Sequence, residues 1–385
     1  MRIVADRGIL SLDSQFGALG ELHKISGREI SQPDLLNADA LLVRSITRVD
    51  EQLLHNTSVK FVGSATSGTD HIDLDYLQEN NIRFVDAKGS NAQAVVEFCF
   101  AALARLSVTE NLNFFEKTFA LIGAGCVGGL YAEYLRKLGI KCLICDPLLA
   151  SSRQRELEAL GCQFVTLSQA LSSDVVSIHT SLTSTGLHPT YHLLDRDKFN
   201  SLAPGVVILN AARGEVINNA ALVETLKLRN DLRVVLDVWE NEPDINSELL
   251  GLVTLASPHI AGYSAEAKSG ATQRLRQGLV EFLGVDSKQY MKATTSPASE
   301  LLLKSSGIKS TDTFCDHVLR QAIDIEMISK QFRKSFENRP ASAAELFDSI
   351  RQSLVNRHEF TRYRVQSDGL SERQKHFLSV LGFVL

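Results

Sequence analysis

This 385-residue chain has no long apolar run, only a small net charge and few cysteines. The most apolar segment, residues 95–106, is interrupted by Glu97 and Arg105, so no run approaches the roughly 20 residues that a membrane span needs. A net charge of −5 and a pI near 6.1 give no electrostatic reason to expect a nucleic acid or an anionic membrane as partner. Residues 2–6 form a strand-like run directly after residue 1, so we expect no secretion signal. These absences predict a soluble, cytoplasmic protein.

The six cysteines are scattered, unlike the dense pattern of a disulfide-stabilised secreted domain. Cys142 and Cys145 have the C-x-x-C spacing of a redox or zinc site, but they lie in an apolar, strand-like run. No second pair in the sequence completes a zinc site. We therefore expect buried, reduced thiols and no metal.

The composition that remains is that of a globular protein, with 44% hydrophobic and 22% charged residues. At roughly 150 residues per domain, the length suggests two or three domains. Residues 1–90 alternate short apolar runs with segments long enough for helices, and the runs lie at 3–5, 40–43, 59–62 and 82–85. Such alternation predicts a mainly parallel sheet. A long, mostly apolar helix is expected over residues 91–106.

A second series of strands and helices begins at Thr118. We expect strands at 119–122, 141–145, 163–165, 175–179, 206–210, 232–238 and 253–256, which is the pattern of a doubly wound α/β domain. The helix predicted over 126–138 ends at Gly139, and a helix over 262–284 would return the chain to the first domain. Beyond residue 286, a segment rich in Ser, Thr and Lys (287–311) precedes elements expected at 341–354, 362–365 and 372–381. A small separate domain is predicted there.

The segment Gly123-Ala-Gly125-Cys-Val-Gly128 fits G-x-G-x-x-G between a predicted strand and a predicted helix. The first two glycines allow a tight turn and the close approach of a pyrophosphate, and Gly128 lets the helix pack on the strand. Asp146 ends the next strand, where a carboxylate accepts hydrogen bonds from ribose hydroxyls and repels a 2′-phosphate. This combination predicts a dinucleotide site that favours NAD over NADP.

Arg213, Glu242 and His259 each follow a different predicted strand. The carboxyl ends of parallel strands share one edge of a sheet, so we expect these residues near the glycine loop. Singly, each has an ordinary explanation as an ion pair, a solvated acid or a packing residue, but together they favour catalysis. Histidine takes a hydroxyl proton as hydride leaves, a carboxylate orients it, and arginine holds a substrate carboxylate. The set predicts oxidation of a 2-hydroxy acid.

These segments resemble the D-isomer-specific 2-hydroxyacid dehydrogenases, in the order and spacing of that family, over about residues 1–285. The resemblance implies an α/β fold of two lobes, a flavodoxin-like substrate lobe and a Rossmann NAD lobe. It implies that Arg213, Glu242 and His259 are the catalytic trio, with His259 as the acid/base. The implied NAD-binding residues are Gly123, Gly125, Cys126, Val127, Gly128, Asp146, Thr180, Ala211, Ala212, Arg213, Asp237 and Gly262. Ser181 departs from the family, which usually has proline after the threonine.

Three further segments resemble one branch of this family: residues 64–73, residues 260–268 and the tail, notably 347–351 and 357–360. That branch implies a phosphorylated sugar acid as substrate and a homodimer formed through a C-terminal α+β domain. The predicted domains are then a substrate-binding domain (1–92 and 263–285), an NAD-binding domain (93–262) and a dimerisation domain (286–385).

The same resemblance implies Ser45, Thr66 and Tyr263 as substrate ligands, and hydroxyls suit this role because they donate to phosphate or sugar-acid oxygens without adding charge. Arg44 either helps to neutralise a phosphate or is an exposed charge, and the sequence leaves both open. His71 invites a metal interpretation, but acids that cap a helix beside a hydrogen-bonded histidine explain the segment better.

Two alternatives stay open from the sequence. One is another D-2-hydroxyacid dehydrogenase, acting for example on 3-phosphoglycerate or glyoxylate. The other is a non-catalytic, NAD-sensing scaffold, against which the complete Arg213, Glu242 and His259 set argues. Formate dehydrogenases share the fold but pair the histidine with glutamine, where this chain has Glu242.

Overall fold

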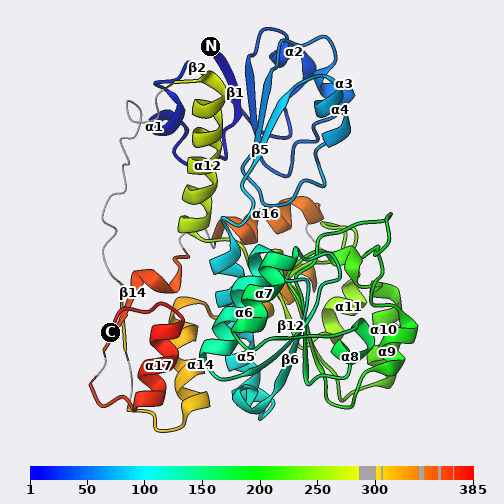
Figure 1. Ribbon diagram of the computed structural model, residues 1–385, viewed down its shortest axis with the longest axis vertical. Helices are drawn as coiled ribbons and strands as arrows, with labels where there is room; N and C mark the ends of the chain where they lie inside the picture. The colour runs from blue at the N-terminus through cyan, green and yellow to red at the C-terminus, as the bar shows by residue number, and fades with distance from the viewer. Residues whose placement is uncertain (286–300, 305–306, 338–341, 354–356, 367) are drawn as a thin grey trace. The chain divides into compact units, whose positions relative to one another are not determined.

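The computed structural model describes residues 1–285, 301–304, 307–337, 342–353, 357–366 and 368–385 (Figure 1). The described chain forms two compact units. The first contains residues 1–91 and 265–285, and the second contains residues 92–264 and the described residues from 301 onward. The predicted three-domain division stays a prediction.

The first unit is built on a parallel five-stranded sheet in the order β2-β1-β3-β4-β5. Its strands are β1 (Arg2–Asp6), β2 (Glu21–Ile25), β3 (Ala40–Val43), β4 (Phe61–Ser64) and β5 (Arg83–Asp86). Its helices are α1 (Leu12–Phe16), α2 (Gln32–Leu35), α3 (Glu51–Leu54), α4 (Leu74–Glu79) and α12 (Ala265–Leu283). The four predicted strands are confirmed. The edge strand β2 was not predicted, because its residues are at most half-buried and form no apolar run.

Helix α12 brings residues from far along the chain onto this first sheet (Figure 1). Leu275 and Leu279 of α12 are fully buried in a cluster with Ile3 and Phe61. Gly278 allows the close approach, since a Cβ there would lie 2.6 Å from the side chain of Val85. The predicted return of the chain to the first unit is confirmed.

The second unit holds a parallel seven-stranded sheet in the order β12-β11-β10-β9-β6-β7-β8. Its strands are β6 (Thr118–Ile122), β7 (Lys141–Cys145), β8 (Gln163–Phe164), β9 (Val175–Ile178), β10 (Val207–Asn210), β11 (Arg233–Leu236) and β12 (Leu255–Ala256). The helices between them are α6 (Cys126–Lys137), α7 (Ser151–Ala159), α8 (Leu167–Ala170), α9 (Arg196–Ser201), α10 (Asn219–Leu228) and α11 (Ser247–Leu252). The chain reverses direction across the sheet between β6 and β9, as in a doubly wound fold. The seven predicted strands are confirmed, and Gly139 follows α6 with a φ of +75°.

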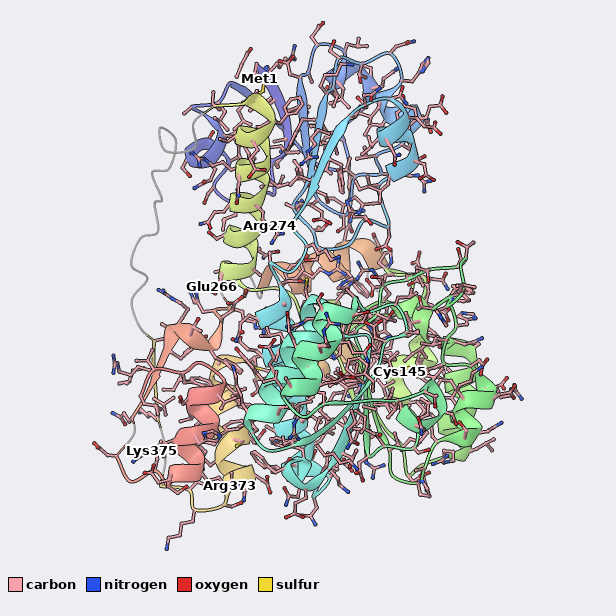
Figure 2. All side chains as sticks on the ribbon, in the orientation of Figure 1. Met1, Cys145, Glu266, Arg274, Arg373 and Lys375 are labelled. Atoms are coloured by element: carbon pink, nitrogen blue, oxygen red, sulfur yellow. The ribbon has the colours of Figure 1, made fainter. Side chains whose placement is uncertain are left out.

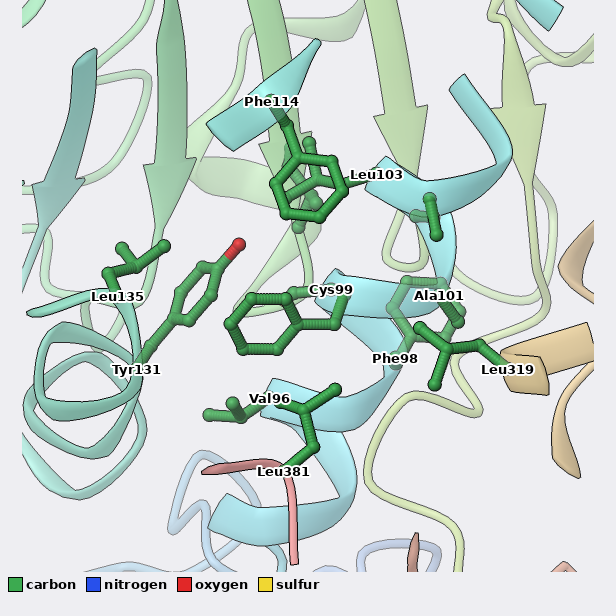
Figure 3. Close-up of a cluster of buried hydrophobic side chains, with 14 of the residues drawn as sticks. Val96, Phe98, Cys99, Ala101, Leu103, Phe114, Tyr131, Leu135, Leu319 and Leu381 are labelled. Carbon is green, nitrogen blue, oxygen red and sulfur yellow. The ribbon is translucent and has the colours of Figure 1, made fainter. Parts of the chain in front are cut away.

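The core of the second unit is organised around α5 (Ala92–Thr109), the long apolar helix that the sequence predicts. Among the described residues it is the one helix apolar and long enough to cross a membrane, but 78% of that window is buried. Figure 3 shows its side chains in a cluster with Tyr131 of α6 and Leu319 of α14 (Thr311–Ala322). Its apolar surface is therefore explained by burial in the core.

Two buried clusters of this unit, the one around α5 and a second one with Phe332 and Phe347, receive the C-terminal elements. These elements are β13 (Leu301–Leu303), α14, α15 (Ile325–Glu337), α16 (Ala343–Ser353), β14 (Tyr363–Val365) and α17 (Glu372–Val380). Strands β13 and β14 pair in parallel as a small second sheet. The elements predicted at 341–354, 362–365 and 372–381 are confirmed where described, whereas α14 and α15 were not predicted. Of the Ser/Thr/Lys-rich segment, residues 287–300 and 305–306 lie outside the described residues.

All six cysteines are free. Cys142 is buried on β7, while Cys145, labelled in Figure 2, is half-buried at the end of that strand. Residues three apart on a strand face opposite sides of the sheet, so these two thiols do not form one site. Cys126 is the exposed cysteine, at the start of α6.

Candidate active site

The predicted site residues of the second unit follow neighbouring strands at one edge of its sheet. Going along the sheet, His259 follows β12, Glu242 follows β11, Arg213 follows β10, Thr180 follows β9, the glycine loop follows β6 and Asp146 follows β7. Because these six strands are adjacent and parallel, their carboxyl ends line a single edge. The predicted convergence on one edge is confirmed, and the roles of the residues stay predictions.

The glycine loop has the backbone geometry of a phosphate cradle. Gly123 has a φ of +92°, and a Cβ there would lie 2.8 Å from the carbonyl oxygen of His179. A Cβ on Gly128 would lie 2.0 Å from the oxygen of Gly123, so only glycine lets α6 pack this closely. At Gly125, by contrast, nothing lies within 4 Å of the Cβ position. The loop therefore leaves open the place where a pyrophosphate approaches the N-terminus of α6.

Asp146 is fixed to this loop. Its Oδ2 accepts the N–H of Ala124 at 2.8 Å, and its Oδ1 accepts the N–H of Leu148 at 3.2 Å. Cys126 and Val127 are the first two residues of α6, directly after Gly125. The carboxylate at the end of β7 suits the ribose of a dinucleotide, and the open glycine backbone beside it suits the pyrophosphate.

His259 and Glu242 form a hydrogen-bonded pair. Nδ1 of His259 lies 2.8 Å from Oε2 of Glu242, and Oε1 of Glu242 accepts the N–H of Trp239 at 2.9 Å. The bond at Nδ1 fixes the ring and leaves Nε2 as the nitrogen that exchanges a proton with a ligand. The two side chains are 40% and 20% exposed, so the pair is reachable from solvent. Their predicted pairing is confirmed.

The charges around Glu242 keep it ionised. Burial alone would raise the pKa of this carboxyl. The charge and hydrogen bond of His259 act in the opposite direction, followed by the Arg351 guanidinium and the N–H of Trp239. Together they hold the pKa of Glu242 below its ordinary value. The carboxylate is therefore negative at neutral pH and stabilises a positive charge on His259.

Asp237 holds the loop that carries the histidine. Its carboxylate is buried and accepts the hydroxyl of Ser257 at 2.6 Å and the N–H groups of Ile260 at 2.7 Å and Ala261 at 2.9 Å. Its backbone oxygen accepts the N–H of His259 at 2.7 Å. The structure thus shows Asp237 as an anchor of this loop, and its predicted contact with NAD stays a prediction.

Arg213 lies in a loop packed against the one that carries Glu242. The Arg213 carbonyl accepts Nδ2 of Asn210 at 2.9 Å, and its Nη1 donates to the oxygen of Ala212 at 2.7 Å. The next residue, Gly214, lies so close to Trp239 that an added Cβ would be 1.9 Å from the Trp239 carbonyl carbon. These contacts place the 210–214 loop and the 239–242 loop side by side.

In the first unit, the predicted substrate ligands also follow adjacent strands. Ser45 is exposed after β3, and Thr66 follows β4, its neighbour in the sheet. The Thr66 hydroxyl lies 2.8 Å from the hydroxyl of Ser64 and 3.1 Å from the carbonyl of Gly68. The third predicted ligand, Tyr263, belongs to the second unit, where its N–H donates to the oxygen of Ile260 at 2.8 Å.

Arg44 forms a bidentate ion pair. Its Nε and Nη2 donate to the two carboxylate oxygens of Asp6, at 2.7 and 3.1 Å, and the Asp6 side chain is fully buried. Arg44 is thus a half-exposed charge at a strand end, paired with Asp6. Whether it contacts a phosphate stays a prediction.

His71 is hydrogen-bonded, with Nε2 2.9 Å from the hydroxyl of Ser64. Asp73 caps α4 by accepting the N–H of Tyr76 at 3.0 Å, as predicted. Within the part of the chain that the structure describes, no group of three His, Cys, Asp or Glu side chains could hold a metal ion.

Two arginines near the site were missed from the sequence. Arg351, on α16, reaches Glu242, and Arg357 reaches the backbone after His259. Both lie in tail segments that the sequence analysis singled out, 347–351 and 357–360, but those segments pointed to a dimer contact. A contact between residues 109 positions apart leaves no local pattern in a single sequence.

Comparison with known proteins identifies the class of this fold and site. The family described as "D-isomer specific 2-hydroxyacid dehydrogenase, NAD binding domain" matches residues 102–261. D-Lactate dehydrogenase from Aquifex aeolicus has a similar structure, with a TM-score of 0.64 and 22% identity, covering 77% of this chain and 100% of that one. For 3-phosphoglycerate dehydrogenase of Entamoeba histolytica the TM-score is 0.62 at 22% identity, covering 74% and 95%. The chain has the fold of the NAD-dependent D-2-hydroxyacid dehydrogenases.

Full-length relatives narrow this class. Erythronate-4-phosphate dehydrogenase of Cellvibrio japonicus is 36% identical over 386 residues, covering 100% of this chain and 99% of the relative. The enzyme of that name from Marinobacter nauticus is 39% identical over 388 residues, covering 100% of both. The chain belongs to the erythronate-4-phosphate dehydrogenase family. The predicted fold class, the NAD-dependent dehydrogenase class and the branch indicated by residues 64–73, 260–268 and the tail are confirmed.

Proposed function

We propose that this chain oxidises the C2 hydroxyl of 4-phospho-D-erythronate with NAD, giving (R)-3-hydroxy-2-oxo-4-phosphooxybutanoate, a step of pyridoxal 5′-phosphate biosynthesis. The observation that carries the chemistry is the hydrogen bond between His259 and Glu242, at the sheet edge that also holds the glycine loop. The full-length relatives support the choice of substrate.

The proposed proton transfer uses Nε2 of His259. Because Nδ1 is engaged with Glu242, Nε2 takes the proton of the C2 hydroxyl, and the ionised Glu242 stabilises the imidazolium that results. NAD, when bound, accepts the hydride from C2. Arg213 holds the substrate carboxylate and polarises the carbonyl that forms at C2. The proton and hydride together account for the two hydrogens that the alcohol loses.

The proposed NAD site extends along the sheet edge from Asp146 to the loop after β12. The open backbone at Gly125 and the N-terminus of α6 suit the pyrophosphate, and Asp146 suits the adenosine ribose. The remaining proposed contacts are Gly123, Cys126, Val127, Gly128, Thr180, Ala211, Ala212, Arg213, Asp237 and Gly262. Ser45, Thr66 and Tyr263 are the proposed substrate ligands.

A homodimer formed through residues 286–385 and a cytoplasmic location complete the proposal. Exposed apolar side chains of the tail, including Leu302 and Met327, support an interface there. Sedimentation of the full-length protein tests the dimer. A species of 42.3 kDa at all concentrations would contradict it.

The test of function is NADH formation by the purified protein with three substrates: 4-phospho-D-erythronate, 3-phosphoglycerate and unphosphorylated erythronate. Preference for the phosphorylated four-carbon acid is expected. Preference for 3-phosphoglycerate would be consistent with the proposed catalytic trio but would contradict the proposed substrate. NAD binding without turnover of any of the three would favour the scaffold alternative.

A further inference from the structure

Arg351 shares the carboxylate oxygen that orients the catalytic histidine. Its Nη2 lies 3.3 Å from Oε2 of Glu242, the same oxygen that lies 2.8 Å from Nδ1 of His259. Its Nε donates to the carbonyl of Pro258 at 2.8 Å, one residue before the histidine. A single side chain thus contacts both the carboxylate of the pair and the backbone that carries its histidine.

The position of Arg351 is fixed by packing. Its guanidinium lies 5.1 Å from the ring centroid of Phe347, one turn earlier on α16. Phe347 is buried and packs edge-on against Phe332 and Phe336 of α15, with ring centroids 5.4 and 6.0 Å apart. The Arg351 side chain is 19% exposed, so its charge is only partly screened by solvent. The tail therefore presents a held positive charge to Glu242.

A second tail arginine supports the other end of the same loop. Arg357 is buried, and its Nη1 donates to the carbonyl of Ala261 at 3.0 Å and lies 3.4 Å from that of Ile260. Its Nη2 donates to the oxygen of Ala94 on α5 at 2.6 Å. The loop with His259 is thus held by arginines on both sides of the histidine, but only Arg351 also contacts the Glu242 side chain.

We propose that Arg351 is a positioning residue of the reaction, which fixes the Glu242 carboxylate and takes up part of its negative charge. This rests on the proposed function, because it assigns His259 the role of base. An unshared Glu242 would hold a proton on His259 more tightly, and oxidation requires His259 to start without that proton. Sharing Oε2 with Arg351 weakens that hold, so oxidation begins at a lower pH.

Other charges near the pair act through the loop backbone. In the described parts of the chain, Arg351 contacts the side chain of Glu242, whereas Asp237 and Arg357 bond to the backbone next to His259. Glu97 and Glu359 face Arg357 in turn. Removing Arg351 leaves all of these in place and takes away two contacts, the charge at Glu242 and the bond to the Pro258 carbonyl.

The test measures kcat and KM for NAD-dependent oxidation as a function of pH in four variants. R351Q and R351M remove the charge, and methionine keeps an apolar stem against Phe347. R351K keeps the charge but loses the planar fork. R333Q is the matched control: Arg333, on α15, also donates to backbone carbonyls of the second unit, but to those of Leu250 and Val253.

For R351Q and R351M, kcat at neutral pH is expected to fall about tenfold, and the acid limb of the kcat profile to move up by about one pH unit. KM is expected to change less than twofold. R351K should lower kcat while leaving the limb in place, and R333Q should leave both unchanged. If one neutral variant does not fold, the other provides the same comparison with R351K.

An acid limb at the wild-type pH in the folded neutral variants would overturn the proposal, even if their melting temperature fell, because that outcome describes a purely structural role. An equal shift in R333Q would overturn it as well. Wild-type protein that binds NAD but turns over none of the three acids would instead overturn the proposed function, and the role of Arg351 with it.

Discussion

Nδ1 of His259 lies 2.8 Å from Oε2 of Glu242, although the two residues come from loops after different strands. The backbone of His259 adopts a left-handed conformation, with a φ of +56°, which is costly for a residue with a Cβ. The bond from its N–H to Asp237 and the neighbouring bonds to the Asp237 carboxylate maintain this conformation. The histidine of the pair is thus held by the hydrogen bonds of its own loop.

Replacing His259 with alanine should lower kcat by about 10² to 10⁴, since the base that takes the hydroxyl proton is lost. NAD affinity, measured by calorimetry, should stay within about threefold of the wild type, because the glycine loop and Asp146 are untouched. H188A, at an exposed histidine, is the control. Turnover by H259A at the wild-type rate would contradict the catalytic assignment.

Glu242→Gln should lower kcat by about 10² or more, because a neutral amide neither stabilises the imidazolium nor fixes the tautomer. A second readout is stability against pH. The folded-state pKa of Glu242 is lowered, so its contribution to stability is present above the unfolded pKa and is lost as pH falls through the folded value. The difference in melting temperature between wild type and E242Q should therefore shrink in acid. A constant difference down to about pH 3 would contradict this.

The contribution of Glu97 to stability should depend on pH in the opposite direction. Glu97 is fully buried on α5, and burial raises its pKa to about 8, opposed mainly by the charge of Arg357. Between the unfolded pKa and about 8 the folded protein binds more protons than the unfolded chain, so this residue costs stability as pH rises through that window. In that window, the free energy of unfolding of E97Q should rise relative to that of the wild type by up to about 1.4 kcal/mol per pH unit. Urea unfolding at several pH values measures this, and a gain that is equal at pH 5 and pH 8 would refute it.

Gly214→Ala should destabilise the protein by about 3 kcal/mol, because the new Cβ would lie 1.9 Å from the backbone of Trp239. The strain would separate the 210–214 loop from the 239–242 loop, so kcat should fall as well. G251A is the matched control, since nothing lies within 4 Å of a Cβ at that helical position. Equal melting temperatures for the two variants would show that the loops are not packed as described.

Replacing Asp146 with asparagine should weaken NAD binding about tenfold and reduce the preference for NAD over NADP. Asparagine keeps an oxygen for the N–H of Ala124, so the loop itself should remain in place. Binding constants for both cofactors provide the test. An unchanged ratio of NAD to NADP affinity would remove Asp146 from the site.

Central strands such as β3 and β10 could be predicted because their residues are buried on both faces and form continuous apolar runs in the sequence. Strand β2 was missed because its residues are exposed or half-buried and form no apolar run. Helix α15, by contrast, could have been predicted, because its buried residues recur at helical spacing among charged ones, which is the pattern of an amphipathic helix.

The parts of the site that could be predicted are those whose residues lie in a short segment after a strand. The glycine loop, Asp146 and His259 each carry a recognisable neighbourhood, so their shared edge could be predicted. The left-handed backbone of His259 and the contact between Arg351 and Glu242 could not, because both depend on packing between segments far apart in the chain.

Helix α5 packs against a helix close to it in sequence, α6, and against one far from it, α17. Its Phe100 contacts Tyr131 of α6 and Phe377 of α17, with ring centroids 5.2 and 6.4 Å apart, and Leu381 lies in the same cluster (Figure 3). During synthesis, therefore, α5 is not fully covered until residues 377–381 have left the ribosome. The second unit therefore cannot complete the core around α5 before α17 has been made, and part of an apolar helix face stays exposed until then.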